Sequence, residues 1–464
     1  MAKISFFGAT GCVTGSRFLF ETDNLRILVD CGLFQGSKEN RLRNWEKFPA
    51  PPSTIDRVLV THAHTDHAGF LPRLGKQGFS GKVHCTRPTA DLCRILLLDS
   101  AHIQEEDARW ANKKGFSKHK PALPLFTVSD AEKVLSQFDP VHYGEQLDLS
   151  DSIRVKFKDA GHLLGSAFID IRKTDGKRRR KIVFCGDLGR PSSALLRDPV
   201  QVYDIDYLVM ESTYGDRLHD DTSFREDLIR VIKESIEREG VLMIPSFAVG
   251  RTQTLLYVLR GLEEAGSIPV LPIYVDSPMA LDALAVYEKR IKDQNLASRT
   301  LRIKGKDVFR PRNLHLCDTP NQSKTISAVG SPAVIIASNG MVTSGRILHH
   351  LIQRLPDPKN TVLFVGYQAE GTRGRDMIDG KESVKIHGRH VSIGAKIENL
   401  TGLSGHADYH ETLAWLMGLN RPPEKLFIVH GEPKASEALA TRIREEFGWE
   451  VVVPAAEEEY ELDL

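Results

Sequence analysis

Residues 1–205 alternate short apolar runs with polar turn residues. Runs rich in Val, Ile, Leu and Phe that are bounded by Gly, Asn or Asp are typical of β-strands. A helix is predicted over residues 88–118, and Thr174-Asp175-Gly176 predicts a hairpin turn. The region is therefore expected to be β-rich. Its predicted strands are residues 4–9, 17–22, 25–30, 57–61, 153–157, 166–172 and 181–187.

Residues 206–385 have a different pattern, in which longer apolar runs are continuous and not alternating. Amphipathic segments at 224–239 and 251–266 separate some of these runs and predict helices. Continuous apolar strands that alternate with helices indicate a parallel sheet covered on both faces. The predicted strands are residues 206–213, 240–247, 269–277 and 333–338.

Residues 386–464 return to shorter segments. The run 426–432 (LFIVHGE) predicts a strand that ends in a histidine, and 435–448 predicts a helix that Gly448 terminates. The acidic tail 457–464 is expected to be a solvated end. We therefore divide the chain into 1–205, 206–385 and 386–464, with the middle part inserted in, or docked on, a fold formed by the other two.

The overall charge is balanced, with 62 Lys and Arg against 61 Asp and Glu and a formal net charge of +1. This balance argues against coating nucleic acid through a global positive field, but it allows a local basic groove. The six cysteines lack C-x-x-C spacing and are expected to be reduced thiols. Because no long apolar run and no secretory signal pattern are present, we expect a cytoplasmic protein that does not bind membranes.

The strongest chemical signal is the segment THAHTDHAG at residues 61–69. His62, His64, Asp66 and His67 lie within six positions, directly after an apolar strand. Imidazole nitrogens and carboxylate oxygens suit zinc and similar divalent ions. A single histidine would more often be a packed or surface residue, but four donors this close together predict a metal site.

Further donors follow apparent strand ends elsewhere in the chain. These are His162 in DAGHLLGSA, Asp187 in FCGDLG and His430 in IVHGE. Taken singly, each has a structural explanation, because a histidine can pack in a core and an aspartate can cap a turn. They indicate a metal site only because they occur in the same chain as the first cluster.

The order Asp30, HAHTDH, His162, Asp187 resembles the metallo-β-lactamase superfamily. The later motifs ESTYGDR, PSFAVGR, DSPMA, SNGMVTSGR, GYQAEGTRGR, SGHADY and VHGE resemble its β-CASP nucleases, which carry an inserted helicase-like domain. The similarity covers essentially the whole chain. It implies an α/β protein, in which a metallo-β-lactamase αββα sandwich contains an inserted β-CASP domain with a parallel sheet flanked by helices. The chain most resembles prokaryotic homologues of the nuclease subunit of cleavage and polyadenylation specificity factor.

The resemblance implies two zinc ions, although other divalent ions are compatible with these donors. One ion would be held by His62, His64, His162 and Asp187. The other would be held by Asp66, His67, Asp187 and His430, so that Asp187 bridges the two. Asp30 would orient a loop or an imidazole behind these ligands.

The implied reaction is hydrolysis of RNA phosphodiester bonds. Two ions about 3.5–4 Å apart activate a water to hydroxide near neutral pH and neutralise phosphate charge. His406, with Glu211 beside it, would act as the general acid toward the leaving group. The implied catalytic residues are Asp66, Glu211 and His406.

Single-stranded RNA is the expected partner, and a homodimer is left open. Glycine-flanked loops and basic side chains would grip the substrate between the domains. The basic, helical stretch 110–120 (WANKKGFSKHK) is a further candidate, although a charged surface helix explains it equally well. The candidate substrate-binding residues are Ser246, Arg251, Ser338, Arg346, Arg373 and Arg375.

Three alternatives remain at this point. The first is a β-CASP nuclease that acts on DNA, but those enzymes typically lack a histidine in the last motif, so His430 favours RNA. The second is a small-molecule hydrolase such as a thioesterase, which would leave the ESTYG, SNGM and SGHAD motifs without a role. The third is a non-catalytic RNA-binding subunit, against which the complete set of ligand positions argues. The choice between endonuclease and 5′–3′ exonuclease stays open, with endonuclease preferred.

Overall fold

The computed structural model describes residues 2–22, 24–115, 117–219, 224–400 and 402–464. It contains two compact units, which are described separately. The first unit comprises residues 1–218 and 405–464, and the second comprises residues 219–404. The second unit is thus inserted within the sequence of the first.

Two mixed sheets form the centre of the first unit. The first sheet has the order β21-β1-β2-β3-β4-β5 and the second has the order β20-β19-β10-β9-β8-β7-β6. The first sheet contains β1 (Ala2–Phe6), β2 (Phe18–Thr22), β3 (Leu25–Val29), β4 (Arg57–Leu59), β5 (Lys82–His84) and β21 (Glu459–Leu462). The second contains β6 (Gln146–Asp148), β7 (Ile153–Asp159), β8 (Ala167–Asp175), β9 (Arg178–Phe184), β10 (Tyr207–Glu211), β19 (Lys425–Val429) and β20 (Val451–Val452).

The main core of this unit lies between its two sheets. Ile4 and Phe20 of the first sheet and Val155 and Ile171 of the second belong to one fully buried cluster. The burial of β7 alternates residue by residue, because side chains on a strand point to opposite faces in turn. This alternation is what the pattern of IRVKF predicts.

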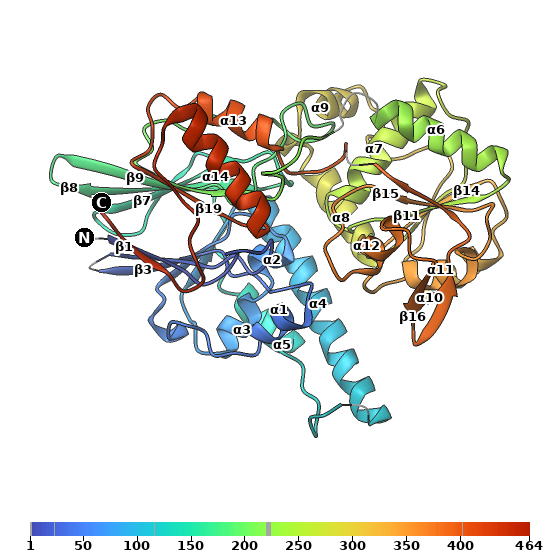
Figure 1. Cartoon of the computed structure of the whole chain (residues 1–464), viewed down its shortest axis with the longest axis horizontal. Coiled ribbons are helices and arrows are strands. Elements are labelled where there is room, and N and C mark those ends of the chain that lie inside the picture. Colours follow the sequence, from blue (N-terminus) through green and yellow to red (C-terminus); the bar gives the residue numbers. More distant parts are fainter. Residues whose placement is uncertain (1, 23, 116, 220–223, 401) are drawn as a thin grey trace. The chain divides into compact units, whose positions relative to one another are not determined.

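Helices cover the outer faces of both sheets, which completes the predicted αββα sandwich (Figure 1). Leu416 of α13 and Leu439 and Ile443 of α14 pack on the outer face of the second sheet. Helices α3 and α5 lie beyond the first sheet (Figure 1). The helices of this unit are α1 (Lys38–Arg43), α2 (Thr65–Ala68), α3 (Leu71–Lys76), α4 (Arg87–Lys114), α5 (Val128–Leu135), α13 (Tyr409–Met417) and α14 (Pro433–Phe447).

The second unit is built on a parallel six-stranded sheet of order β13-β12-β14-β11-β15-β18, as the continuous apolar runs predict. Helices lie on both faces of this sheet (Figure 1). Its strands are β11 (Val241–Pro245), β12 (Ile273–Asp276), β13 (Leu314–Leu316), β14 (Ala333–Ala337), β15 (Thr361–Phe364) and β18 (Lys396–Asn399), beside a hairpin of β16 (Ser383–Ile386) and β17 (Arg389–Ser392). Its helices are α6 (Phe224–Glu237), α7 (Arg251–Glu264), α8 (Pro278–Lys289), α9 (Leu296–Ile303), α10 (Pro320–Thr325), α11 (Ile347–Arg354) and α12 (Arg373–Ile378).

The boundaries of the compact units lie later than the divisions at 205/206 and 385/386 suggest. The run 206–213 contains β10, which pairs in parallel with both β9 and β19 and therefore belongs to the second sheet of the first unit. A continuous apolar run shows that a strand is buried on both faces, but it does not show which sheet buries it. The parallel-sheet interpretation therefore holds for 240–247, 269–277 and 333–338, and it assigned 206–213 to the wrong sheet.

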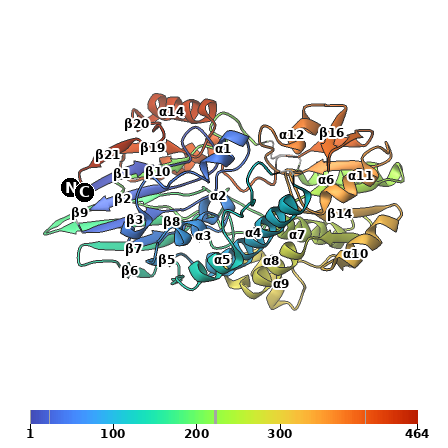
Figure 2. The same ribbon diagram turned by 90° about the horizontal axis from the view of Figure 1, so that it is seen from below.

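The prediction that the tail 457–464 is a solvated end holds for most of its side chains, which are exposed, but it missed a strand and two buried leucines. Residues Glu459–Leu462 form β21, which pairs antiparallel with β1, so both chain ends lie side by side at one end of the first unit (Figure 2). Leu462 and Leu464 join the core, while Glu459 contacts Lys3 at the surface. The alternation of acidic and apolar residues in YELDL is the period-2 pattern of an edge strand.

The predicted hairpin at residues 174–176 is confirmed, because β8 and β9 pair antiparallel with Asp175 opposite Arg178. The helix predicted over 88–118 ends at Lys114, and Gly115 adopts a left-handed conformation there (φ 67°). Within the described ranges, no helix combines the length and apolar character that crossing a membrane requires.

Candidate metal centre

Strand ends of the first unit carry the predicted ligands. The loop after β4 holds His62 and His64, and the short helix α2 that follows holds Asp66 and His67. The remaining three ligands lie in the loops that follow β7, β9 and β19 of the second sheet. Residues that are up to 368 positions apart in sequence, from His62 to His430, are thereby brought to one place. The three residues after these strands are His162, Asp187 and His430.

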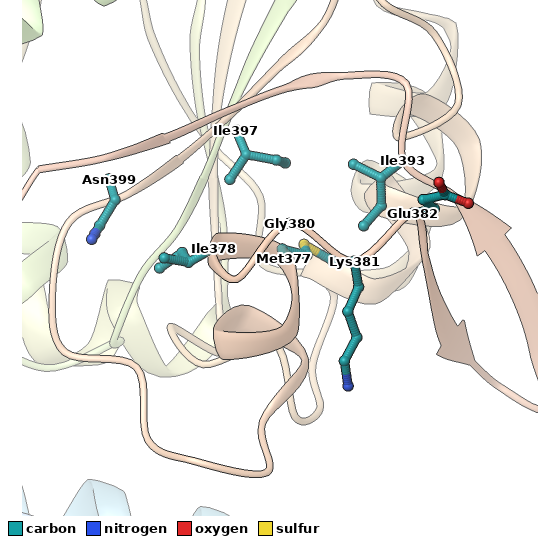
Figure 3. Close-up of a pocket in the computed structure, with 8 residues that line it drawn as sticks. All are labelled: Met377, Ile378, Gly380, Lys381, Glu382, Ile393, Ile397 and Asn399. Atoms are coloured by element: carbon teal, nitrogen blue, oxygen red, sulfur yellow. The ribbon is translucent and has the colours of Figure 1, made fainter.

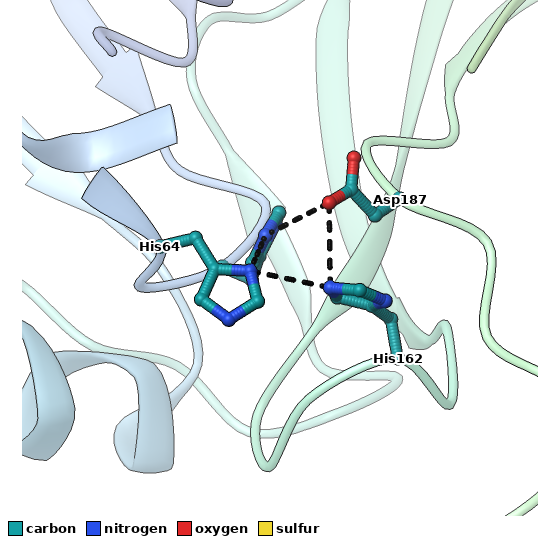
Figure 4. Close-up of side chains that lie close together, drawn as sticks. His64, His162 and Asp187 are labelled. Carbon is teal, nitrogen blue, oxygen red and sulfur yellow. Dashed lines mark hydrogen bonds and ion pairs between the residues drawn. The ribbon is translucent and has the colours of Figure 1, made fainter. Parts of the chain in front are cut away.

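A first group consists of His62, His64, His162 and Asp187, whose candidate ligand atoms all lie within 4.8 Å of one another. Asp187 Oδ2 lies 3.3 Å from both His62 Nε2 and His162 Nε2. His64 Nδ1 lies 3.0 Å from His62 Nε2 and 3.2 Å from His162 Nε2. Figure 4 shows the side chains of His64, His162 and Asp187 directed toward one another. The composition of this group is the one that the family resemblance implies for the first ion.

A second group consists of Asp66, His67 and His430. His430 Nε2 lies 3.3 Å from Asp66 Oδ2 and 3.3 Å from His67 Nε2. Asp187 Oδ1 lies 3.2 Å from His67 Nε2, whereas its other oxygen faces the first group. The Asp187 carboxylate therefore stands between the two groups, in the position that a bridging ligand requires.

Glu211 is a further candidate ligand that the sequence interpretation treated only as the partner of His406. Its carboxylate shares a group with Asp187 and His430 whose ligand atoms also lie within 4.8 Å. Glu211 is 4% exposed and lies at the end of β10, next to the strand that precedes His430. The close approach of Glu211 to these donors follows from the parallel pairing of β10 with β19.

The donor set fits a divalent cation. Both carboxylate oxygens of Asp187 are buried and accept no hydrogen bond. Burial lowers the pKa of His62 to about 3 and that of His64 to about 4, so both rings are neutral at pH 7 and offer a lone pair. A buried carboxylate without donors is costly unless a cation compensates it. Neutral imidazoles that converge on such a carboxylate match the preference of zinc.

Asp30 lies behind the cluster and contacts one of its imidazole rings. Its Oδ2 lies 2.8 Å from His67 Nδ1, and its Oδ1 accepts a hydrogen bond from the backbone N–H of Thr61. The Thr61 hydroxyl donates to Asp30 Oδ2 at 2.8 Å and lies 3.0 Å from His62 Nδ1. These contacts hold two imidazole rings with Nε2 toward the centre. Sequence interpretation missed Thr61, although it directly precedes the histidine cluster.

His406 and Glu211 form the predicted pair beside the metal-ligand cluster. His406 Nδ1 lies 3.0 Å from both carboxylate oxygens of Glu211 and 3.9 Å from Asp187 Oδ2. Burial alone lowers the pKa of His406, but the carboxylates of Glu211 and Asp187 outweigh it and raise this pKa to about 9. The ring is therefore protonated at neutral pH in this arrangement.

Backbone contacts fix the position of both members of this pair. The N–H of Leu188 donates to Glu211 Oε1 at 2.7 Å, and Thr213 donates to Oε2 through its backbone and its hydroxyl. Gly189 pairs with His406 in an isolated β-bridge. A Cβ on Gly189 would lie 2.1 Å from the backbone of Gly161, so only glycine allows this approach. Thr213 is a second residue that sequence interpretation missed.

Three predicted substrate-binding arginines of the second unit already have internal partners. Arg346 donates to Asp276 Oδ1 at 2.8 Å and to two backbone carbonyls. Arg373 donates to three backbone carbonyls, and Arg375 donates to Asp379, the residue that follows the end of α12. These contacts hold loops of the second unit together. They leave the three guanidinium groups fewer N–H donors for contacts with a phosphate.

Of the other three predicted substrate-binding residues, Ser246 and Ser338 directly follow β11 and β14, and Arg251 begins the helix after β11. Ser246 is buried and accepts a hydrogen bond from the Thr252 hydroxyl at 3.1 Å. Ser338 Oγ lies 2.8 Å from Ser277 Oγ, and Arg251 is the half-buried first residue of α7. Such strand ends are where open α/β sheets usually bind ligands. A substrate role for these residues stays a prediction.

A pocket of about 370 Å³ lies elsewhere in the second unit, between α12 and β18 (Figure 3). Its lining is mainly aliphatic, with Met377, Ile393 and Ile397, and its charged side chains Lys381 and Glu382 are neighbours in sequence. None of the histidine and carboxylate groups described above contributes to it. The pocket is therefore separate from the candidate metal ligands of the first unit.

The αββα sandwich and the histidine and aspartate cluster at its strand ends define a hydrolase of the metallo-β-lactamase type. Family models agree along the chain. The metallo-β-lactamase superfamily domain matches residues 19–199, and the Beta-Casp domain matches residues 252–377. The Zn-dependent metallo-hydrolase RNA specificity domain matches residues 390–454.

Relatives match over nearly the full length. Ribonuclease TTHA0252 of Thermus thermophilus is 37% identical over 440 residues, which cover 94% of this chain and 95% of that protein. Transcription termination factor FttA of Methanocaldococcus jannaschii is 32% identical over 465 residues, which cover 97% of this chain and 70% of that protein. The chain therefore belongs to the β-CASP family of the metallo-β-lactamase superfamily.

A solved structure of a protein of unknown function from Enterococcus faecalis shares the fold. It superposes with a TM-score of 0.54 at 13% sequence identity and covers 99% of each chain. At this identity the similarity concerns the fold alone.

Proposed function

We propose that the protein is a ribonuclease that hydrolyses phosphodiester bonds of single-stranded RNA with the help of two zinc ions. The observation that carries the proposal is the Asp187 carboxylate, which is buried, makes no hydrogen bond and stands between two groups of imidazole and carboxylate ligands. The names of the relatives, a ribonuclease and a transcription termination factor, support RNA as the substrate. His430, which follows β19, is in keeping with this choice over DNA.

The proposed ligands of one ion are His62, His64, His162 and Asp187, and those of the other are Asp66, His67, Asp187 and His430. Bound there, two zinc ions would lower the pKa of a water molecule and neutralise charge on the phosphate. Asp66, whose side chain is 20% exposed, is the most accessible carboxylate of the set and is proposed to take part in catalysis. Thr61 and Asp30 keep the rings of His62 and His67 turned toward this centre.

His406 is proposed to donate the proton that the leaving oxygen requires. Its Nδ1 faces Glu211, so the proton for transfer would be carried on Nε2. Glu211 favours the charged ring and holds its orientation, in the manner of a carboxylate paired with a catalytic histidine. Hydrolysis with this polarity would leave a 5′-phosphate and a 3′-hydroxyl.

The test offers zinc-loaded protein three substrates in parallel: a labelled single-stranded RNA with both ends blocked, the matched DNA and a thioester. Internal cuts in the RNA are expected, which would also establish endonuclease action. If only an RNA with an accessible 5′ end is degraded, the 5′–3′ exonuclease alternative takes its place. RNA that survives while DNA or the thioester is consumed would overturn the proposal.

Two finer features belong to the same proposal. We place the activity in the cytoplasm, since all six cysteines are unpaired thiols and five of them are buried. A homodimer stays a prediction, which light scattering of the purified protein checks directly. For this purpose the concentration is varied, because a dimer that forms by mass action dissociates on dilution.

A further inference from the structure

The carboxy-terminal part of α4 and the segment after it carry an unusual local charge. From Ala108 to Ser129 the chain has five Lys or Arg residues and no Asp or Glu, although the whole chain is almost neutral. Arg109 is held by Glu106 of the preceding turn. No described residue forms an ion pair with the other four cations, which are Lys113, Lys114, Lys118 and Lys120.

The described residues on either side of position 116 are joined by hydrogen bonds, and the end of α4 projects from its unit (Figure 1). The end of α4 extends away from the two sheets, and the following segment returns along the helix (Figure 1). Asn112 exchanges two hydrogen bonds with the backbone of Ala122, at 2.9 and 2.7 Å. Nearer the sheets, Gln104 accepts a hydrogen bond from the N–H of Leu125. We call residues 108–115 and 117–124 of this helix and return segment the α4 arm.

An exposed tryptophan lies on the α4 arm among the lysines. The side chain of Trp110 is 54% exposed, whereas Trp415 in the core of the same unit is 7% exposed. Lys114 Nζ lies 4.9 Å from the centre of the Trp110 ring. An exposed indole beside a cation offers an aromatic face on which another ring can stack.

We propose that the α4 arm is a binding site for single-stranded RNA, in which a base stacks on Trp110 and the lysines of the arm contact the phosphates. An aromatic platform between cations is how proteins hold single strands without sequence preference. The inference rests on the proposed function, because it assigns part of the substrate to this site. It concerns nucleotides away from the bond that is cut.

The charge of the arm favours RNA over a protein partner. A protein that covered Trp110 would have to supply several carboxylates, whereas a polynucleotide carries one phosphate per residue along its whole length. The spacing also fits, since Lys113 and Lys114 follow Trp110 by about one helical turn and share its end of the helix.

The experiment measures binding of a fluorescein-labelled oligouridylate by anisotropy across a range of salt concentrations. It uses the full-length Asp187→Ala protein, in which the RNA stays intact. Trp110→Ala should weaken binding roughly tenfold, and Trp110→Phe should restore most of the affinity because it keeps an aromatic face. Replacing the arm lysines should lower the slope of log affinity against log salt by about 0.7 for each phosphate that is no longer neutralised. The lysine variant carries Lys113→Gln, Lys114→Gln, Lys118→Gln and Lys120→Gln.

Matched controls change residues of the same type outside the arm. Trp45 is 51% exposed, so Trp45→Ala removes a similar area. The lysine control carries Lys38→Gln, Lys47→Gln, Lys133→Gln and Lys324→Gln, all at exposed positions. The inference is overturned if the arm variants bind like their controls, or if they alter only the oligomeric state. Cleavage of the same RNA by wild-type protein tests the proposed function independently, since it can succeed whichever way the arm behaves.

Discussion

Two buried aspartates, one in each unit, show how similar sequence contexts lead to different chemistry. Asp276 ends β12 and is fully paired, since Arg346, Ser323 and His350 donate to it at 2.7–2.8 Å. Asp187 follows β9 and accepts no hydrogen bond, although imidazole nitrogens lie 3.2–3.3 Å away. A carboxylate that is fully hydrogen-bonded holds a fold together, whereas a buried carboxylate that makes no hydrogen bond and converges with several imidazoles is suited to bind a cation.

The comparison is tested most strongly by Asp187→Ala. We expect RNA cleavage to fall by roughly a thousandfold or more, because both proposed ions lose a shared ligand worth several kcal/mol in the transition state. Binding of RNA should persist. The measurements are single-turnover cleavage, zinc content by elemental analysis and RNA binding by anisotropy. Retention of two zinc ions and of activity would remove the bridging role.

Asp276→Ala should lower the stability of the protein but leave its zinc content unchanged. Removing one partner of a buried charge network typically costs about 3–5 kcal/mol, because Arg346 and His350 lose their acceptor. Denaturant unfolding should show this loss of stability, while zinc content stays that of the wild type. If Asp276→Ala lost zinc without losing stability, the two aspartates would not differ as proposed.

Asp276 should stabilise the protein less at acid pH. The difference in the free energy of unfolding between wild-type and Asp276→Asn protein should therefore become smaller as the pH falls. Burial raises the pKa of this aspartate, but the contacts from His350, Ser323 and Arg346 outweigh burial and bring the pKa below its ordinary value of 3.8. The stabilisation is thus fully present above pH 3.8 and is lost as the pH falls through the lower folded-state pKa. Unfolding of wild-type and Asp276→Asn protein at neutral and acid pH measures this. If the difference in the free energy of unfolding became larger in acid, the lowered pKa of Asp276 would be contradicted.

His406→Ala should separate proton transfer from metal binding. We expect cleavage to slow by roughly a hundredfold, which is the lower range for a general acid, with zinc content unchanged. His406→Gln serves as a control of similar size that cannot be protonated. Loss of zinc in either variant would make His406 a ligand and would remove its proposed role in proton transfer.

Thr61→Val is expected to have the smallest effect. It removes the hydroxyl that contacts Asp30 and His62 while keeping the shape of the side chain. Contacts behind metal ligands typically contribute a factor of about 10 to 100 in metal affinity, so we expect about tenfold weaker zinc binding. Competition with a chelator measures the affinity, and added zinc should restore cleavage. An affinity equal to that of the wild type would show that Asp30 orients the rings alone.

Local patterns predicted much of the fold correctly. The alternating residues of β7 and the turn at 174–176 are predicted within a few residues, because side-chain direction and turn geometry are local properties. The edge strand β21 was missed because its pattern is short and acidic. The sequence interpretation placed β10 in the sheet of the second unit, but it belongs to a sheet of the first unit. The error arose because a strand that is buried on both faces has the same composition in both units.

The candidate site also contains residues that the sequence predicts and residues that it does not. His62, His64, Asp66 and His67 are visible as a cluster because one loop and one helical turn hold all four. Thr61 and Thr213 were missed because their hydroxyls gain a role only from what packs beside them. For Arg346, the sequence suggested a phosphate contact, but the structure shows that Asp276 already occupies its guanidinium.

The sequence by itself determined the family, the order of the ligand motifs and the elements that carry them, because these depend on neighbouring residues. FCGD and IYVD, which end in Asp187 and Asp276, look alike as apolar strands that close on an aspartate. Only the tertiary structure decided which carboxylate is hydrogen-bonded. The side chains around both aspartates come from distant strands and helices. The packing of the chain decides whether these side chains donate hydrogen bonds to the carboxylate or converge with it as possible metal ligands.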